Sequence, residues 1–125
     1  MNFTACKDGD VSFHDGNPLV FSKGEFFAIC GDAFWDNQHG ADLFCKTLSY
    51  ESGAIQRVKG RSTSTSKAFR VGVCLNTDIN LSTCSGGRNK HTIHPFKECT
   101  NGYTYKIVCS GGNGAKASCK PGFFI

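Results

Sequence analysis

Five basic side chains lie close together near the middle of this 125-residue chain, within fourteen positions that contain no acid. The hydroxyl-bearing residues 62–66 lie among them. Arginine and lysine bind sulfate, phosphate and carboxylate groups through charge-assisted hydrogen bonds, so this segment predicts a polyanion site. A solvated basic loop that only keeps the protein soluble explains the same residues equally well. The five bases are Arg57, Lys59, Arg61, Lys67 and Arg70.

A second basic group lies between residues 88 and 97, and it consists of Arg88, Lys90, His91, His94 and Lys97. We expect its arginine and lysines to contribute to the same kind of binding. Proteins that bind single-stranded nucleic acid place stacking aromatic residues among their bases, and neither group does so. We therefore expect a polyanionic glycan or a cell-surface protein as the partner, and no nucleic acid.

The histidines raise the alternative of catalysis. A small basic protein with eight cysteines and four histidines also describes a pancreatic-type ribonuclease. In such an enzyme His14, His91, His94 and a lysine would serve as acid, base and phosphate contact. The sequence expected around those histidines is absent, and no nucleophile elbow supports a Ser-His-Asp triad. We therefore expect a protein that is not an enzyme, with a small hydrolase or nuclease as the least favoured alternative.

The cysteine content indicates an oxidising compartment. Eight cysteines in 125 residues are an even number at high density. Small secreted domains use disulfides to compensate for a modest core. No Cys-x-x-Cys pair is present, which argues against zinc. N-glycosylation sequons at Asn2 and Asn80 also favour secretion. We expect one extracellular glycoprotein domain over residues 1–125.

The sequence predicts neither a targeting segment nor a membrane span. Residues 1–5 lack the apolar core of a signal peptide, so we expect the chain to correspond to a form from which a signal has been removed. No apolar run approaches the length that crosses a bilayer, so we expect no membrane insertion.

Charge is unevenly distributed along the chain. Residues 1–51 contain eight acids and three bases, whereas residues 52–125 contain two acids and eleven bases. The formal charges of the two parts are therefore −5 and +9, which gives the net charge of +4. This asymmetry predicts an acidic side and a basic side, unless strands from the two parts interleave.

Hydrophobic periodicity predicts the elements that must position these residues. Residues 26–29 predict a strand that leads into a helix at residues 36–48, with Asp36 as its N-cap. Residues 49–68 are rich in Ser, Gly and Thr and predict a long surface loop. One face of the helix is expected to carry Ala41, Phe44, Cys45 and Leu48. The other expected elements are a polar arm at 1–10, turns at 15–18 and 22–24 between short strands, and strands at 68–74 and 103–109.

An ordered set of motifs runs through most of the chain. It comprises Gly24-x-Phe26-x-x-Ile29-Cys30-Gly31-Asp32, an aromatic–Asp step at Trp35-Asp36, a helix with Ala41-x-x-x-Cys45 and an exit at Leu48-x-Tyr50. Cys74 and Cys84 enclose nine residues, as do Cys99 and Cys109. The set resembles a scavenger receptor cysteine-rich (SRCR) domain whose core spans residues 11–109. The segment between Cys30 and Cys45 is longer than is usual in that family, so the resemblance is to a divergent member.

The resemblance implies an α+β fold in which a curved antiparallel sheet cradles one α-helix. It also implies the disulfides Cys30–Cys99, Cys45–Cys109 and Cys74–Cys84. Cys6 and Cys119 remain, and we expect them to join the N-terminal arm to the C-terminal tail as a feature of this protein.

SRCR domains often hold calcium through an Asp-Asp pair after the first core cysteine and a Glu before the last. Here Gly31 replaces the first Asp, which leaves Asp32 alone, and Tyr103 and Thr104 stand where the Glu would be. Calcium requires several oxygen ligands, commonly carboxylates. We therefore expect no metal and no cofactor.

These observations favour a secreted, non-enzymatic binding module that recognises a polyanionic glycan or a cell-surface ligand through its basic loop. The alternative is a protein–protein recognition module that acts in adhesion, defence or receptor binding.

Overall fold

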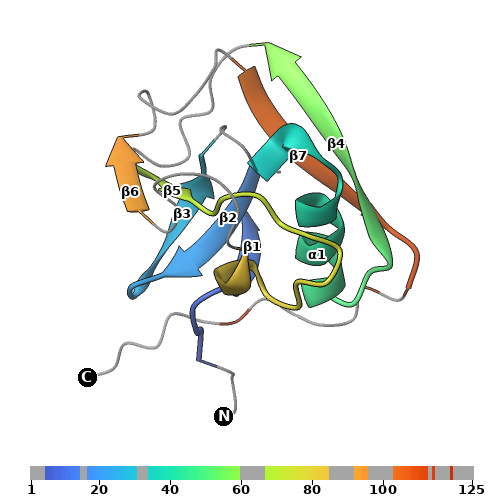
Figure 1. Cartoon of the computed structure of the whole chain (residues 1–125), viewed down its shortest axis with the longest axis horizontal. Coiled ribbons are helices and arrows are strands. Elements are labelled where there is room, and N and C mark those ends of the chain that lie inside the picture. The colour runs from blue at the N-terminus through green and yellow to red at the C-terminus, as the bar shows by residue number, and fades with distance from the viewer. Residues whose placement is uncertain are drawn as a thin grey trace.

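A computed structural model describes residues 5–14, 17–30, 34–59, 67–84, 92–95, 103–112, 114 and 119. These residues form an α+β structure that is rich in strands and contains one α-helix (Figure 1). The strands are β1 (Val11–His14), β2 (Asn17–Ser22), β3 (Glu25–Ile29), β4 (Ser52–Lys59), β5 (Lys67–Arg70), β6 (Thr92–Pro95) and β7 (Tyr103–Ser110). The helices are α1 (His39–Thr47) and the 3-10 turns η1 (Phe34–Asp36) and η2 (Leu81–Thr83).

Five strands form one sheet in the order β1-β2-β3-β5-β6. β1, β2 and β3 are successive antiparallel neighbours, and β5 pairs antiparallel with β6. β3 and β5 pair in parallel, however, so the sheet is mixed and the prediction of a purely antiparallel sheet was wrong. Chain order explains the difference, because α1 and β4 lie between β3 and β5 and the chain re-enters the sheet from the same end.

The turn between β2 and β3 was predicted at residues 22–24, and the structure confirms it. Ser22 pairs with Glu25, so Lys23 and Gly24 form a two-residue loop. Both loop residues have positive φ, 50° for Lys23 and 92° for Gly24, as a type I′ hairpin turn requires. A lysine in this left-handed region costs about 1 to 2 kcal/mol, so the flanking strands hold it there.

β4 and β7 form a separate antiparallel ribbon, which runs in register from the pair Ser52–Ser110 to the pair Lys59–Tyr103. The expected loop at residues 49–68 was therefore wrong for residues 52–59. Gly53 and Ile55 of β4 lie on the side that faces α1, whereas the intervening Ala54 and Gln56 are exposed. This polar, glycine-containing segment forms a strand because one of its sides is buried and because β7 provides hydrogen-bond partners.

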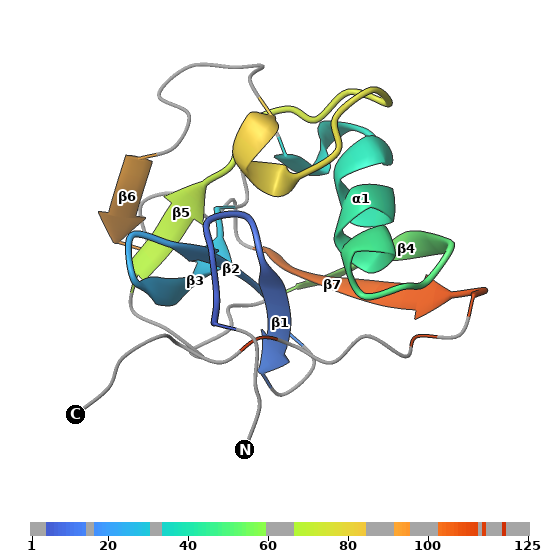
Figure 2. The same ribbon diagram turned by 90° about the horizontal axis from the view of Figure 1, so that it is seen from below.

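Helix α1 packs over the ribbon and beside the five-stranded sheet (Figure 2). The side chains predicted to form its apolar face, Ala41, Phe44, Cys45 and Leu48, are all buried. Together with residues of β1, β2, β3, β5, β7 and η2 they form the main core. The helical period therefore predicted the buried face correctly.

The predicted beginning of the helix was wrong. Residues 34–36 form η1, and the residue that precedes α1 is Gln38, whose side chain makes no capping hydrogen bond. The helix N-terminus is instead tied to β4 through both backbone groups of Gly53. The Gly53 N–H donates to the Asp42 carboxylate at 3.0 Å, and its carbonyl accepts from the Gln38 side-chain amide.

The strand expected at residues 68–74 is shorter than predicted. β5 ends at Arg70, and Gly72 has a φ of 92°, which an extended strand does not adopt. The predicted last strand, in contrast, is present as β7, with Ile107 buried and Tyr105 and Cys109 partly buried on its inner side.

Three disulfides cross-link these elements. Cys45–Cys109 joins α1 to β7, Cys74–Cys84 closes the loop that contains η2, and Cys6–Cys119 joins the N-terminal segment to residue 119. These pairs are the three expected among the described cysteines. Cys30 is also disulfide-bonded, and Cys99, its expected partner, lies outside the described residues.

Candidate functional site

The basic residues near the middle of the chain lie on strands rather than in one exposed loop. Arg57 is exposed on β4, and Lys59 is the last residue of that strand. Lys67 is exposed at the start of β5, and Arg70 is half-buried at its end. Arg61 lies outside the described residues. The group is therefore divided between the ribbon and the five-stranded sheet, and the predicted continuous basic loop is wrong at both ends.

Arg57 lies beside an aromatic pair on the ribbon. It is directly opposite Tyr105 in the β4–β7 register. The Tyr105 ring stacks on that of Trp35, with centroids 4.8 Å apart and an interplanar angle of 8°. Both rings are partly buried, so this end of the ribbon is stiffened by packing close to the base.

Charge is segregated among the strands. β4, β5, β6 and β7 contain five bases and no acid, whereas β1, β2 and β3 contain one acid, Glu25, and no lysine or arginine. β4, β5 and β7 are thus positive, β6 contributes only His94, and β5 pairs with β3 in one sheet. The five bases are Arg57, Lys59, Lys67, Arg70 and Lys106.

Most of the second basic group falls outside the described residues, namely Arg88, Lys90, His91 and Lys97. His94 is on β6, where its backbone pairs with Ala68. Of the two predicted glycosylation sites, Asn2 is also outside the described part of the chain. The Asn80 side chain accepts a hydrogen bond from the Ser82 N–H at 2.7 Å and so caps η2.

Two groups of cysteine and aspartate lie close enough to suggest a metal centre, Cys6–Asp10–Cys119 and Cys74–Asp78–Cys84. In both groups the sulfurs are bonded to each other, so neither group offers a thiolate ligand. Asp10 accepts from the Lys7 N–H at 2.9 Å, and Asp78 accepts from the Leu75 N–H at 2.7 Å. These carboxylates therefore hold local turns. Gly31 and Asp32, where the resemblance to SRCR domains would place a calcium site, lie outside the described residues.

Calcium is expected to leave the thermal unfolding midpoint unchanged. A ligand that binds only the folded state must raise the midpoint, and the sequence retains too few carboxylates at the calcium position to hold the ion. The measurement is thermal unfolding in millimolar calcium against the same buffer with a chelator. A clear rise with calcium would contradict the expected loss of the site.

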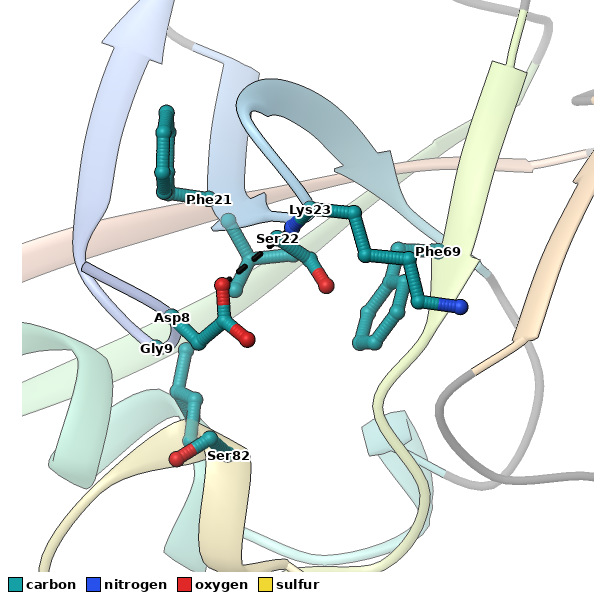
Figure 3. A pocket seen from close by; sticks show the side chains of 9 residues that line it. Asp8, Gly9, Phe21, Ser22, Lys23, Phe69 and Ser82 are labelled. Carbon is teal, nitrogen blue, oxygen red and sulfur yellow. Dashed lines mark hydrogen bonds between the residues drawn. The ribbon is translucent and has the colours of Figure 1, made fainter. Parts of the chain in front are cut away.

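A pocket of about 170 Å³ opens on another part of the surface, between four segments of the chain (Figure 3). The N-terminal segment contributes Asp8 and Gly9, and the β2–β3 hairpin contributes Ser22 and Lys23. The lining is completed by Val20, Phe21, Phe69, Leu81 and Ser82. Sequence reasoning found the hairpin turn but not the pocket, because the segments are far apart along the chain.

Part of the polar arm predicted at residues 1–10 is attached to the sheet by backbone hydrogen bonds as well as by Cys6–Cys119. Gly9 donates to the Phe21 carbonyl at 3.0 Å, and Phe21 donates to the Asp10 carbonyl at 2.8 Å. These two bonds attach residues 9–10 to β2 and place Asp8 beside Lys23, whose N–H donates to the Asp8 carboxylate at 3.2 Å.

The described part of the chain contains no helix with the length and apolar character that a membrane span needs. Comparison with protein families and with curated proteins finds no match to this chain.

Proposed function

We propose that the protein is a binding module for a polyanionic glycan, with the leading contacts on and between β4 and β5. The charge segregation of the strands carries this proposal: five bases and no acid lie on the four later strands. A repeating anion such as a sulfated glycan can contact several such bases at once, because each contributes a charge-assisted hydrogen bond. The leading residues are Arg57, Lys59, Arg61, Lys67 and Arg70, with Arg88, Lys90 and Lys97 as the second group.

The fold proposed for this module is a divergent SRCR-like domain of a secreted protein. Two of the disulfides that the resemblance implies, Cys45–Cys109 and Cys74–Cys84, are present, and the first of them joins α1 to the last strand. The disulfides fit an extracellular protein, because such bonds persist in oxidising compartments. The parallel pairing of β3 with β5 differs from the antiparallel sheet that the SRCR resemblance implies.

A protein–protein recognition module remains the second candidate, and one observation favours it. The loop closed by Cys74–Cys84 exposes two apolar side chains, Leu75 with 54% and Ile79 with 85% of its surface. Exposed apolar side chains held in a closed loop suit contact with another protein. His14 and His94 are on β1 and β6, the opposite edges of the five-stranded sheet, whereas His91 lies outside the described residues.

The replacement of Arg57 and Lys59 with alanine is expected to lower the salt concentration at which the protein elutes from immobilised heparin. A protein with two fewer bases neutralises fewer sulfate groups and so releases fewer counterions on binding. By analogy with nucleic acids, the dependence of affinity on salt concentration should also become shallower. Stability is expected to change by less than about 1 kcal/mol, because Arg57 is exposed and charged pairs at a protein surface contribute little to folding.

The matched control is the pair Lys23→Ala and Lys46→Ala, which removes the same charge from the earlier part of the chain. We expect this control to elute close to the wild-type protein. If both variants elute at salt concentrations lowered by the same amount, then binding to heparin depends only on the net charge of the protein. If the Arg57 and Lys59 variant elutes at the same salt concentration as the wild-type protein, the result favours the protein–protein recognition module.

A further inference from the structure

The pocket near the N-terminal segment has an apolar interior. Val20, Phe69 and Leu81 line it, and each is buried, with 1%, 5% and 1% of its surface exposed. A cavity of about 150 Å³ is large enough for a benzene ring. The present pocket, of about 170 Å³, therefore has room for one aromatic ring or one branched aliphatic group.

Among the described residues that line this space, Asp8 carries the one carboxylate. One oxygen of Asp8 accepts from the Lys23 N–H at 3.2 Å, and the carboxylate is directed toward the opening between the N-terminal segment and Phe69 (Figure 3). The Lys23 side chain passes over Phe69 and carries its ammonium group beyond the ring (Figure 3). Asp8 is exposed, so its negative charge lies at the mouth of the pocket, which the Lys23 cation also lines.

The walls of the pocket are held in place before any ligand arrives. The type I′ turn fixes the direction of the Lys23 N–H, and the Asn80 side chain caps η2 while it packs against Gly9. Gly9 has a φ of 95°, and a Cβ at this position would collide with Asn80, so glycine is required for this contact. Cys6–Cys119 and Cys74–Cys84 brace the two segments. Such preorganisation lowers the entropy lost on binding.

We propose that this pocket binds an apolar ring or branched aliphatic group that carries a primary ammonium on a short stem. The apolar group occupies the space between Val20, Phe69 and Leu81, and the ammonium pairs with Asp8. This chemistry has two possible sources, a free arylalkylamine and the apolar N-terminal residue of a peptide. None of the basic side chains of the later strands lines the pocket, so its existence does not depend on polyanion binding.

The test uses three probes that share a phenyl ring and differ in charge: phenethylamine, phenethyl alcohol and 3-phenylpropionate. Each is titrated into the ¹⁵N-labelled full chain, and the backbone amide signals of Lys23 and Ser82 are followed. We expect phenethylamine to bind about fivefold more tightly than the alcohol, which is the ratio that one exposed ion pair provides. The carboxylate probe is expected to bind most weakly.

Two variants separate the pocket from general electrostatics. Asp8→Asn retains an acceptor for the Lys23 N–H but removes the charge, so it should abolish the preference for the amine over the alcohol. Glu25→Gln makes the same change of charge on an exposed residue that does not line the pocket, and it should retain the preference. Lys23→Gln should strengthen binding of the amine, because a competing cation is removed.

A fourth probe, the amide of the tripeptide Phe-Gly-Gly, distinguishes the two sources. Binding at least as tight as that of phenethylamine supports a peptide N-terminus, and weaker binding supports a free amine. The proposal is overturned if the carboxylate probe binds as tightly as the amine. It is also overturned if Asp8→Asn keeps the preference, or if the shifted signals lie away from the pocket lining.

Discussion

Replacement of both Cys45 and Cys109 with alanine is expected to lower the free energy of unfolding by about 4 kcal/mol or more. The bond joins residues 64 positions apart, so its loss returns considerable conformational freedom to the unfolded chain. Cys45 is also fully buried, and alanine there leaves a small cavity where α1 meets the ribbon. Urea denaturation of the variant and the wild-type protein, extrapolated to water, measures the difference.

The matched control is the double replacement of Cys74 and Cys84, which also removes one disulfide but opens a loop with a sequence separation of only 10. The chain-entropy estimate for that shorter loop is about 3 kcal/mol. If the variant lacking Cys74–Cys84 loses more stability than the variant lacking Cys45–Cys109, then the bond between α1 and β7 is not the principal covalent stabiliser of the core.

Gly53→Ala is expected to destabilise the protein by about 2 to 3 kcal/mol, although alanine is normally better than glycine within a strand. A Cβ at position 53 would lie 2.8 Å from the Ala41 carbonyl oxygen and 2.5 Å from the Cys45 sulfur. Both belong to α1, and the Gly53 backbone groups bond to Asp42 and Gln38 at the start of that helix. The added methyl group must therefore push the helix away from β4.

Ser52→Ala, at the neighbouring exposed position, provides the control and is expected to change stability by less than about 0.5 kcal/mol. The same denaturation experiment measures both variants. A Gly53→Ala protein that is as stable as the wild type would show that the close approach of α1 to β4 is not required for folding.

The two proposals depend on different side chains, so the Arg57 and Lys59 variant and the Asp8→Asn variant test them independently. Bases of β4 and β5 carry the polyanion proposal, whereas Asp8 and the apolar pocket lining carry the amine proposal. One variant should lose affinity for heparin but retain phenethylamine binding, and another should retain affinity for heparin but lose phenethylamine binding. Together these results would establish two separate sites on one small domain.

Local patterns predicted several elements correctly. The spacing of Ala41, Phe44, Cys45 and Leu48 predicted the buried face of α1, because one side of a helix must be apolar wherever it packs on a core. The turn at residues 22–24 was also predictable, since Ser22-Lys23-Gly24 is a short polar, glycine-containing segment between two apolar runs. The three pairings seen among the described cysteines agree with those expected from the resemblance and its leftover pair.

Errors arose where a distant segment decides the structure. Residues 52–59 have the composition of a loop, yet they form β4 because β7 supplies hydrogen bonds on one edge and α1 covers one face. Asp36 is suited to capping a helix, but residues 34–36 form η1, and the helix begins at His39, where Gly53 meets Asp42 and Gln38. Composition within a short window contains no information about such partners.

The α+β fold was expected from the SRCR resemblance. The sequence by itself determined a cysteine-rich chain with one amphipathic helix and with positive charge concentrated in its later part. These properties depend on residue type and short-range spacing. Only the tertiary structure decided that the central bases lie on two strands in different sheets and that Asp8, Lys23, Phe69 and Ser82 enclose a pocket. The physical reason is that strand pairing and pocket formation depend on contacts between segments separated by tens of residues, and those contacts form only when the whole core packs.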